Sequence, residues 1–219
     1  MLKRVLEAEL MDTTQDAHEY DTMDHQAVNR TLVDDLLAAG KISGEILDLG
    51  TGTAQVAVEL CRRADKVIVR AVDLAESMLE IARANVVMAN LAERIFLDLA
   101  DAKALPYAEG RFAGVMSNSL VHHIAEPRRV VQEAVRVVRS GGWLFFRDLL
   151  RPVDEGALRR LVEIHAAAAT AHQKCLFSAS LRAALTLQEV RALILAIGFS
   201  PDTVVQSSDR HWTWAAHKT

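Results

Sequence analysis

Hydrophobic positions in the first two thirds of the chain switch repeatedly between two spacings. Residues 23–39 carry apolar side chains every three or four positions, which predicts an amphipathic helix that ends at Gly40. Residues 45–49 form a short apolar run before a glycine turn, which predicts a buried strand. Strand and helix patterns then alternate, which favours a parallel sheet with helices on both faces. The predicted strands of this region are 45–49, 66–72, 94–97, 112–118 and 143–149. A helix with Val56, Leu60 and Ala64 on one face follows the first strand, and the later helices are 77–91 and 127–138.

The last third of the chain departs from this alternation. An Ala-rich stretch predicts one long helix over 155–171, followed by a loop over 174–178. A further helix is predicted over 187–197, and short strands over 203–207 and 211–217. We therefore expect a single domain over 1–219 with four parts. These are an N-terminal helical lid over 1–40, a core over 41–150, a helical insertion over 151–186, and a C-terminal helix with strands over 187–219.

Composition narrows the class of protein. Of the 219 residues, 51% are hydrophobic and 25% are charged, which excludes a wholly disordered chain. Acidic residues outnumber basic ones by 29 to 25, so the sequence lacks the basic excess that binds phosphate backbones, and no nucleic-acid partner is expected. Cys61 and Cys175 both lie in apolar surroundings and are expected to be buried thiols of a reducing compartment.

Neither a membrane-spanning segment nor a targeting segment is expected. Residues 1–16 are charged throughout, and no apolar stretch reaches the length of about 18 residues that spans a bilayer. We therefore expect a cytoplasmic protein without a membrane partner. The oligomeric state stays open, and a homodimer is compatible with the sequence.

Polar residues follow the predicted strands, where open α/β sheets bind their ligands. This places many polar side chains along one edge of the sheet, as a ligand site requires. In chain order they are Asp48, Gly50, Thr51, Gly52 and Thr53 around the end of the first strand, Asp73 after the second, Asp98 and Asp101 after the third, Asn118, Ser119, His122 and His123 after the fourth, and Arg147 and Asp148 at the fifth.

The glycine turn indicates which ligand is expected. Gly50 and Gly52 allow a tight turn and a close approach of the backbone to a ligand, although they could also be plain turn glycines. A dinucleotide fingerprint needs a third glycine at position 55, where this chain has Gln55. Asp48 precedes the turn, and its negative charge disfavours a pyrophosphate but suits an ammonium group. The turn therefore favours a cationic ligand.

Two further acidic residues indicate a nucleoside. Asp73 lies 21 residues beyond Gly52, where a carboxylate can accept hydrogen bonds from both ribose hydroxyls, although it could also cap the next helix. Asp101, with the backbone amide of Ala102, could bind an adenine edge, and Asp98 is a close competitor for that role. A purine nucleoside that carries an amino-acid cation satisfies all three sites, and S-adenosylmethionine has this composition.

The segments ILDLGTGTAQVAVEL, VDLAESML, DAKALPYAEGRF, VMSNSLVHHI and RVVRSGGWLFFRDLL together resemble the class I S-adenosylmethionine-dependent methyltransferases, in particular those that act on small molecules. The resemblance covers about residues 46–150. It implies a Rossmann-like, seven-stranded, mostly parallel α/β sheet with an antiparallel last strand. It also implies cofactor-binding roles, namely the methionine moiety for residues 48–53, the ribose for Asp73 beside Leu74 and Met78, the adenine for Asp101 with Ala102, and the methyl region for Asn118 with Ser119.

Two other groups are candidates for the site. Tyr20 and Met23 in the N-terminal segment could close over the methionine end of the cofactor, or could simply pack on a helix face. His122 and His123 are candidates for a catalytic base if the acceptor must lose a proton. Because adjacent residues of a regular element point in different directions, only one of them is expected to face the pocket. No metal site is expected, since the pair has neither an H-x-x-x-H spacing nor a cysteine nearby.

The sequence therefore predicts methyl transfer from S-adenosylmethionine to a small-molecule substrate, with S-adenosylhomocysteine as the product. Two alternatives stay open. One is an NAD(P)-dependent oxidoreductase, which the missing third glycine disfavours. The other is a non-catalytic module of the same fold that senses the cofactor. The acceptor atom is not specified by the sequence.

Overall fold

A computed structural model describes residues 2–7, 17, 21–22 and 26–219 of the chain. The chain divides into two compact units, which are treated separately below. The larger unit comprises residues 10–118, 129–146 and 215–219, and the smaller unit comprises residues 1–9, 119–128 and 147–214. The predicted division into a lid, a core, an insertion and a C-terminal part stays a prediction.

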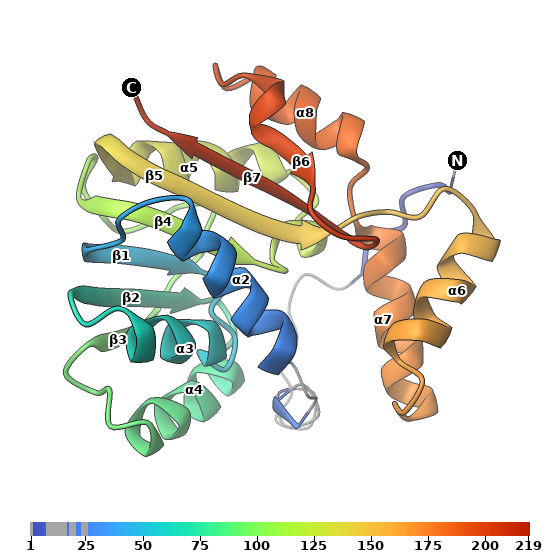
Figure 1. Cartoon of the computed structure of the whole chain (residues 1–219), viewed down its shortest axis with the longest axis horizontal. Coiled ribbons are helices and arrows are strands. Elements are labelled where there is room, and N and C mark those ends of the chain that lie inside the picture. The colour runs from blue at the N-terminus through green and yellow to red at the C-terminus, as the bar shows by residue number, and fades with distance from the viewer. Residues whose placement is uncertain (1, 8–16, 18–20, 23–25) are drawn as a thin grey trace. The chain divides into compact units, whose positions relative to one another are not determined.

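Seven strands form one sheet in the order β3-β2-β1-β4-β5-β7-β6 (Figure 1). β1 is parallel to β2 and to β4, β2 is parallel to β3, and β6 pairs antiparallel with β7. The predicted Rossmann-like, mostly parallel α/β sheet is therefore confirmed. The strands are β1 (Gly44–Leu49), β2 (Val67–Asp73), β3 (Ile95–Leu99), β4 (Phe112–Asn118), β5 (Val138–Leu149), β6 (Val204–Gln206) and β7 (His211–His217).

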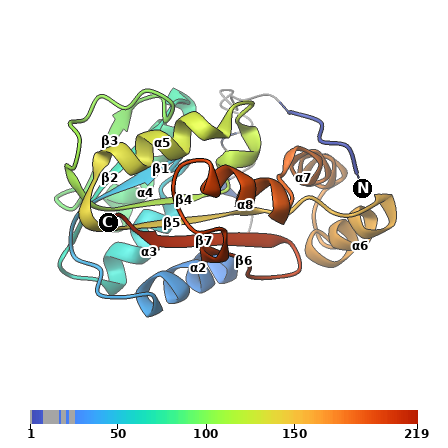
Figure 2. The same ribbon diagram turned by 90° about the horizontal axis from the view of Figure 1, so that it is seen from above.

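Helices cover both faces of the sheet in the larger unit. α2 (Gln26–Ala38) and α3 (Gln55–Arg63) lie on one face, and α5 (Pro127–Val137) lies on the opposite face (Figure 2). α4 (Glu76–Met88) follows β2 and contacts β3. Each helix buries an apolar stripe, and Leu36, Leu60 and Met116 belong to one continuous core.

Arg94 fastens the start of β2 to the end of α3. Its guanidinium donates hydrogen bonds to the carbonyl oxygens of Cys61, Ala64 and Val67. These carbonyl groups lie at the end of a helix or strand or in the loop between them, where they have no N–H partner within the helix or the sheet. The arginine therefore supplies hydrogen bonds that these buried acceptors need.

β5 begins five residues earlier than predicted. The sequence predicts a stop at 140–142 because of two consecutive glycines. In the structure, Gly141 donates its N–H to the carbonyl oxygen of Lys218, and Lys218 donates to that of Gly142. This pairing with the end of the chain draws residues 138–142 into the strand, and Gly141 adopts the positive φ of 72° that glycine tolerates.

The smaller unit contains α6 (Glu155–His165), α7 (Ala171–Ala183) and α8 (Leu187–Leu195), together with the short 3-10 helices Val121–His123 and Pro201–Thr203. The prediction of one helix over 155–171 with a loop over 174–178 is wrong. Thr170 starts a new helix through a capping box, in which its side chain accepts the N–H of Gln173 and the Gln173 side chain accepts that of Thr170. The two helices bury Leu158, Leu161 and Leu181 in the core of this unit.

Cys61 is buried as predicted, whereas Cys175 is exposed, because it lies on an outer face of α7 and not in the predicted loop. Among the described residues, no helix combines the length and the hydrophobicity that a membrane span requires.

Candidate functional site

The turn after β1 is built by left-handed backbone positions. Gly50 and Gly52 have φ angles of 67° and 54°, which glycine adopts without the steric penalty of a Cβ atom. Ala54 has a φ of 61° directly before α3, so the turn is strained at that non-glycine position as well. The N–H of Thr51 donates to the carbonyl oxygen of Val72 and ties the turn to β2. The two glycines are therefore required by the path of the backbone.

Asp48 lies under this turn with only 2% of its surface exposed. Its Oδ2 accepts a hydrogen bond of 2.7 Å from the hydroxyl of Thr51. Burial raises the pKa of Asp48 to about 7, the hydrogen bond from Thr51 lowers it in part, and the nearby charge of Asp73 raises it further. A cationic group in the adjacent space would lower the cost of ionising this carboxyl, so the position favours a positively charged ligand.

Asp73 occupies the end of β2 and reaches the same turn. Its Oδ2 accepts the N–H of Gly52 at 2.8 Å, and its Oδ1 accepts the N–H of Ala75 at 3.0 Å. The carboxylate is thus fixed by backbone donors between the glycine turn and the start of α4. Of its predicted neighbours, Leu74 is 42% exposed, and Met78 is buried against Ala75.

A small pocket, open to solvent, lies beside the turn in the larger unit. Five residues predicted for the cofactor site line it: Asp48, Gly50, Thr51, Thr53 and Asn118. The other lining residues are Asn29, Gln55 and Val56. Among the described residues, Gly52, Asp73, Asp101 and Ala102 lie outside this lining. The structure therefore gathers the predicted methionine-binding turn with Asn118, whereas the predicted nucleoside-binding residues lie beyond the pocket.

Gln55 is the residue of this pocket whose role the sequence analysis missed. Its side chain accepts a hydrogen bond from Asn29 at 3.4 Å and donates one of 2.8 Å to Asp21. Asp21 also accepts from Asn85 of α4 at 2.9 Å. These bonds join three helices and the N-terminal segment around the pocket. The presence of Gln55 at the start of α3, where a dinucleotide-binding site has glycine, is the sequence signal from which this role could have been predicted.

Tyr20 and Met23 lie outside the described residues, on either side of Asp21. Their predicted role stays a prediction.

The two acidic candidates near β3 have different surroundings. Asp98 accepts a 2.6 Å hydrogen bond from the hydroxyl of Tyr107 and lies 3.5 Å from Arg70. Asp101 follows the strand, accepts the backbone N–H of Lys103 at 2.8 Å and precedes the buried Ala102. Asp101 is also paired with a side chain, since Lys103 Nζ lies 3.1 Å from its Oδ1. The contacts therefore do not separate the two candidates, and the adenine-binding role of Asp101 stays a prediction.

In the smaller unit, His122 is buried against Asp148. Its Nδ1 lies 2.6 Å from Asp148 Oδ1, and its backbone N–H donates to Oδ2 at 3.1 Å. Burial alone would raise the pKa of Asp148 and lower that of His122, but their mutual attraction outweighs it, so the pKa of Asp148 is lowered and that of His122 is raised. Ser119 has a positive φ of 55° and donates its N–H to the carbonyl oxygen of Arg147.

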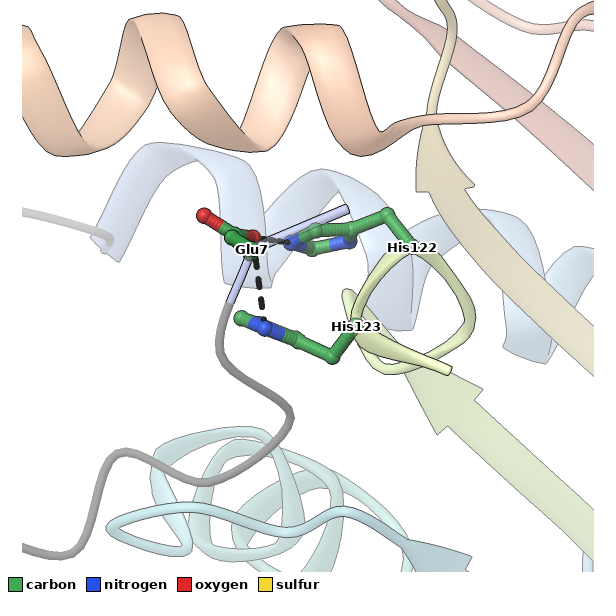
Figure 3. A group of neighbouring side chains, drawn as sticks. All are labelled: Glu7, His122 and His123. Carbon is green, nitrogen blue, oxygen red and sulfur yellow. Dashed lines mark ion pairs between the residues drawn. The ribbon is translucent and has the colours of Figure 1, made fainter. Parts of the chain in front are cut away.

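Both histidine rings face a third residue, Glu7. Its Oε1 lies 3.4 Å from His122 Nε2 and 3.2 Å from His123 Nδ1 (Figure 3). Both rings thus face Glu7, whereas neither lines the pocket beside Asp48, so the expectation that only one of them faces the ligand pocket stays a prediction. The pair lies in a 3-10 turn, and its ring centres are 4.1 Å apart. Glu7 and Asp148 complete a cluster that the sequence analysis did not assemble, since Glu7 lies far from the histidines along the chain.

Comparison with known proteins finds similarity to methyltransferases. Residues 47–146 match the family of the methyltransferase domain. The chain is 27% identical over 176 residues to 27-O-demethylrifamycin SV methyltransferase of Amycolatopsis mediterranei, an alignment that covers 79% of this chain and 61% of that protein. It is 33% identical over 106 residues to methyltransferase GfsG of Streptomyces halstedii, which covers 48% of this chain and 38% of that protein.

A solved structure shares the fold. A SAM-dependent methyltransferase from Aquifex aeolicus superposes with a TM-score of 0.71 at 16% identity, and the match covers 94% of this chain and 99% of that one. By contrast, the chain spans less than two thirds of the length of the two curated relatives named above.

Proposed function

Since residues 47–146 are a class I S-adenosylmethionine-dependent methyltransferase domain, we propose that this protein transfers the methyl group of S-adenosylmethionine to a small-molecule acceptor. The observation that carries the proposal is the buried carboxyl of Asp48 beneath the two-glycine turn, with a pKa raised to about 7. Such a carboxyl is stabilised by a cation, and the cofactor has an ammonium and a sulfonium group. A pyrophosphate would add negative charge at the same place.

The residues around the turn fit this cofactor. We assign the methionine end to Asp48 and the Gly50–Gly52 turn, the ribose to Asp73 and the adenine to Asp101 with Ala102. The support for the ribose assignment is that backbone N–H groups of Gly52 and Ala75 hold the carboxylate at the end of β2, where parallel α/β sheets bind their ligands. Asn118 lines the pocket beside Asp48, which supports a place near the methyl group.

When bound, the cofactor supplies a methyl group already activated by its positively charged sulfur. The protein's task is therefore alignment. Asp48 fixes the charged end, Asp73 fixes the sugar, and the hydrogen bonds among Asn29, Gln55 and Asp21 fix the wall of the pocket. Holding two reactants in line can contribute about 7–11 kcal/mol to the lowering of the barrier. The prediction that His122 or His123 acts as a base stays a prediction.

The acceptor is proposed to be a metabolite and not a nucleic acid. This rests on the similarity to 27-O-demethylrifamycin SV methyltransferase and on the acidic charge balance of the chain. We also propose that the protein works in the cytoplasm. A homodimer is compatible with this function.

Labelled cofactor tests the proposal directly. The protein is incubated with methyl-labelled S-adenosylmethionine and metabolite fractions, and labelled products are separated by chromatography. We expect a labelled small molecule with the natural sequence and with Asp65→Asn, which changes an exposed carboxylate, and a strong loss with Asp73→Asn. Binding of the cofactor without any labelled product would instead identify a cofactor-sensing module.

A further inference from the structure

We propose that Glu7, His122 and His123 form a binding site for a divalent transition-metal ion of the zinc type. All three residues belong to the smaller unit, and one ligand atom from each lies within 4.8 Å of the other two. Figure 3 shows the carboxylate of Glu7 facing both imidazole rings. The proposal does not depend on methyl transfer, because metal binding is measured without cofactor or acceptor.

The two distances from Glu7 to the histidine nitrogens match those between the ligands of a tetrahedral ion. Glu7 Oε1 lies 3.4 Å from His122 Nε2 and 3.2 Å from His123 Nδ1. An ion with bonds of about 2.0–2.1 Å in tetrahedral geometry separates its ligand atoms by about 3.3–3.4 Å. All three ligand atoms lie within 4.8 Å of one another, so rotation of the two rings would bring them to coordination distance of one ion.

Asp148 orients His122 for this role. The Asp148 carboxylate accepts the backbone N–H groups of His122 and Leu149, so it acts as an acceptor toward the ring as well. His122 Nδ1 lies 2.6 Å from Oδ1 of Asp148 and donates its N–H to that oxygen. When the ring is neutral, its lone pair is therefore on Nε2, the atom that faces Glu7. A carboxylate that holds the second nitrogen of a histidine is the usual outer contact of a metal ligand.

Glu7 presents a buried oxygen to the two rings. Its Oε1 has no hydrogen-bond partner among the described residues, whereas its Oε2 accepts from the hydroxyl of Ser180 at 3.3 Å. Arg4 fixes the same segment, since its guanidinium donates to the carbonyl oxygens of Ala183 and Ile124. This buried oxygen faces the two ring nitrogens, and a cation between Glu7 and the rings would stabilise it.

The ligand set selects the class of ion. Two imidazole nitrogens and one carboxylate oxygen suit Zn²⁺, Co²⁺, Ni²⁺ or Fe²⁺, whereas Mg²⁺ and Ca²⁺ prefer oxygen ligands only. Three protein ligands leave one position of a tetrahedron for water or another oxygen ligand.

Metal titration tests the site. The chelator-treated, untagged full-length chain is titrated with Zn²⁺ by calorimetry and with Co²⁺ by visible absorption. We expect one equivalent to bind, with the absorption of cobalt in a tetrahedral nitrogen and oxygen environment. Glu7→Gln should weaken binding by about a hundredfold or more, and Asp148→Asn by about 10–100-fold because it loosens the ring orientation. His165→Asn is the matched control, since His165 also pairs with a carboxylate, Asp209, and should leave binding unchanged.

Two results would overturn the proposal. One is that the natural sequence binds no more Zn²⁺ or Co²⁺ than Glu7→Gln does, and the other is that His165→Asn lowers binding as much as Glu7→Gln. If the buried Asp148→Asn variant does not fold, Glu7→Gln decides alone, because the Glu7 side chain is 17% exposed and lies near the N-terminus. The metal titration does not measure cofactor binding, which involves residues of the larger unit. Failure of the metal proposal would therefore not count against the proposed function.

Discussion

Replacing Asp48 by Asn should stabilise the ligand-free protein while weakening cofactor binding. The native state holds this carboxyl at a pKa of about 7, above the ordinary value of 3.8, mainly because burial disfavours its charge. A group whose pKa is raised on folding binds more protons in the native state than in the unfolded state. The free energy of unfolding therefore falls as the pH rises from about 4 to 7, and stays reduced at higher pH.

The magnitude follows from the two pKa values. The difference between 3.8 and about 7 corresponds to about 4 kcal/mol at pH 8, which is an upper bound because local relaxation and entry of water reduce it. Asn keeps an oxygen that can accept the hydroxyl of Thr51. We therefore expect Asp48→Asn to raise the free energy of unfolding by about 1–3 kcal/mol at pH 8, and by less at pH 5.

Cofactor binding should change in the opposite direction. Loss of a hydrogen bond to a charged group costs about 1.5–3 kcal/mol, so the affinity for S-adenosylhomocysteine should fall by about tenfold to a hundredfold. Urea unfolding of the ligand-free protein at pH 5 and pH 8, together with calorimetric titration, measures both effects. Asp65→Asn serves as the exposed control. A lower free energy of unfolding for Asp48→Asn, or an unchanged affinity for S-adenosylhomocysteine, would show that Asp48 is not a buried carboxyl that binds a cationic ligand.

Three further outcomes are expected. Asp73→Asn should lower the affinity for S-adenosylhomocysteine by about tenfold or more in calorimetry, and an unchanged affinity would remove the ribose assignment. Gly114→Ala should lower the free energy of unfolding by about 1–3 kcal/mol or more in urea, because the new Cβ would lie 2.0 Å from the ring of Trp143, and a variant of unchanged stability would contradict this packing. A thiol reagent at pH 8 should label Cys175 quickly and Cys61 only after unfolding, since burial raises the pKa of Cys61 to about 11, and rapid labelling of both would contradict the fold of α3.

Features encoded by neighbouring residues were predictable from the sequence. The strand over 112–118 has the predicted bounds because a continuous apolar run, buried on both faces, ends at a polar residue. The strand over 211–217 also has its predicted bounds, because apolar and polar residues alternate along it. The glycine turn and Asp48 were also predictable from the sequence, since the five consecutive residues 48–52 contain the whole motif.

Features that depend on distant contacts were not predictable in the same way. The break between α6 and α7 is an exception, because its T-x-x-Q capping signal, Thr170 and Gln173, is local; it was missed because alanine on both sides of it favours helix. Gln55 acquires its role only when α2, α3 and α4 meet. Glu7 contacts the histidines only after the chain has folded. The periodicity of hydrophobic residues predicts strands and helices, and it does not predict contacts between residues far apart in the sequence.

The central claim is that the pocket beside Asp48 accepts the amino-acid end of a sulfur nucleoside, whose ammonium group is positively charged. The most direct test is a pair of calorimetric titrations of the natural protein, one with S-adenosylhomocysteine and one with NADH. We predict that one equivalent of the nucleoside binds with micromolar affinity or better and that the dinucleotide does not bind. Micromolar binding of NADH without binding of S-adenosylhomocysteine would contradict the account.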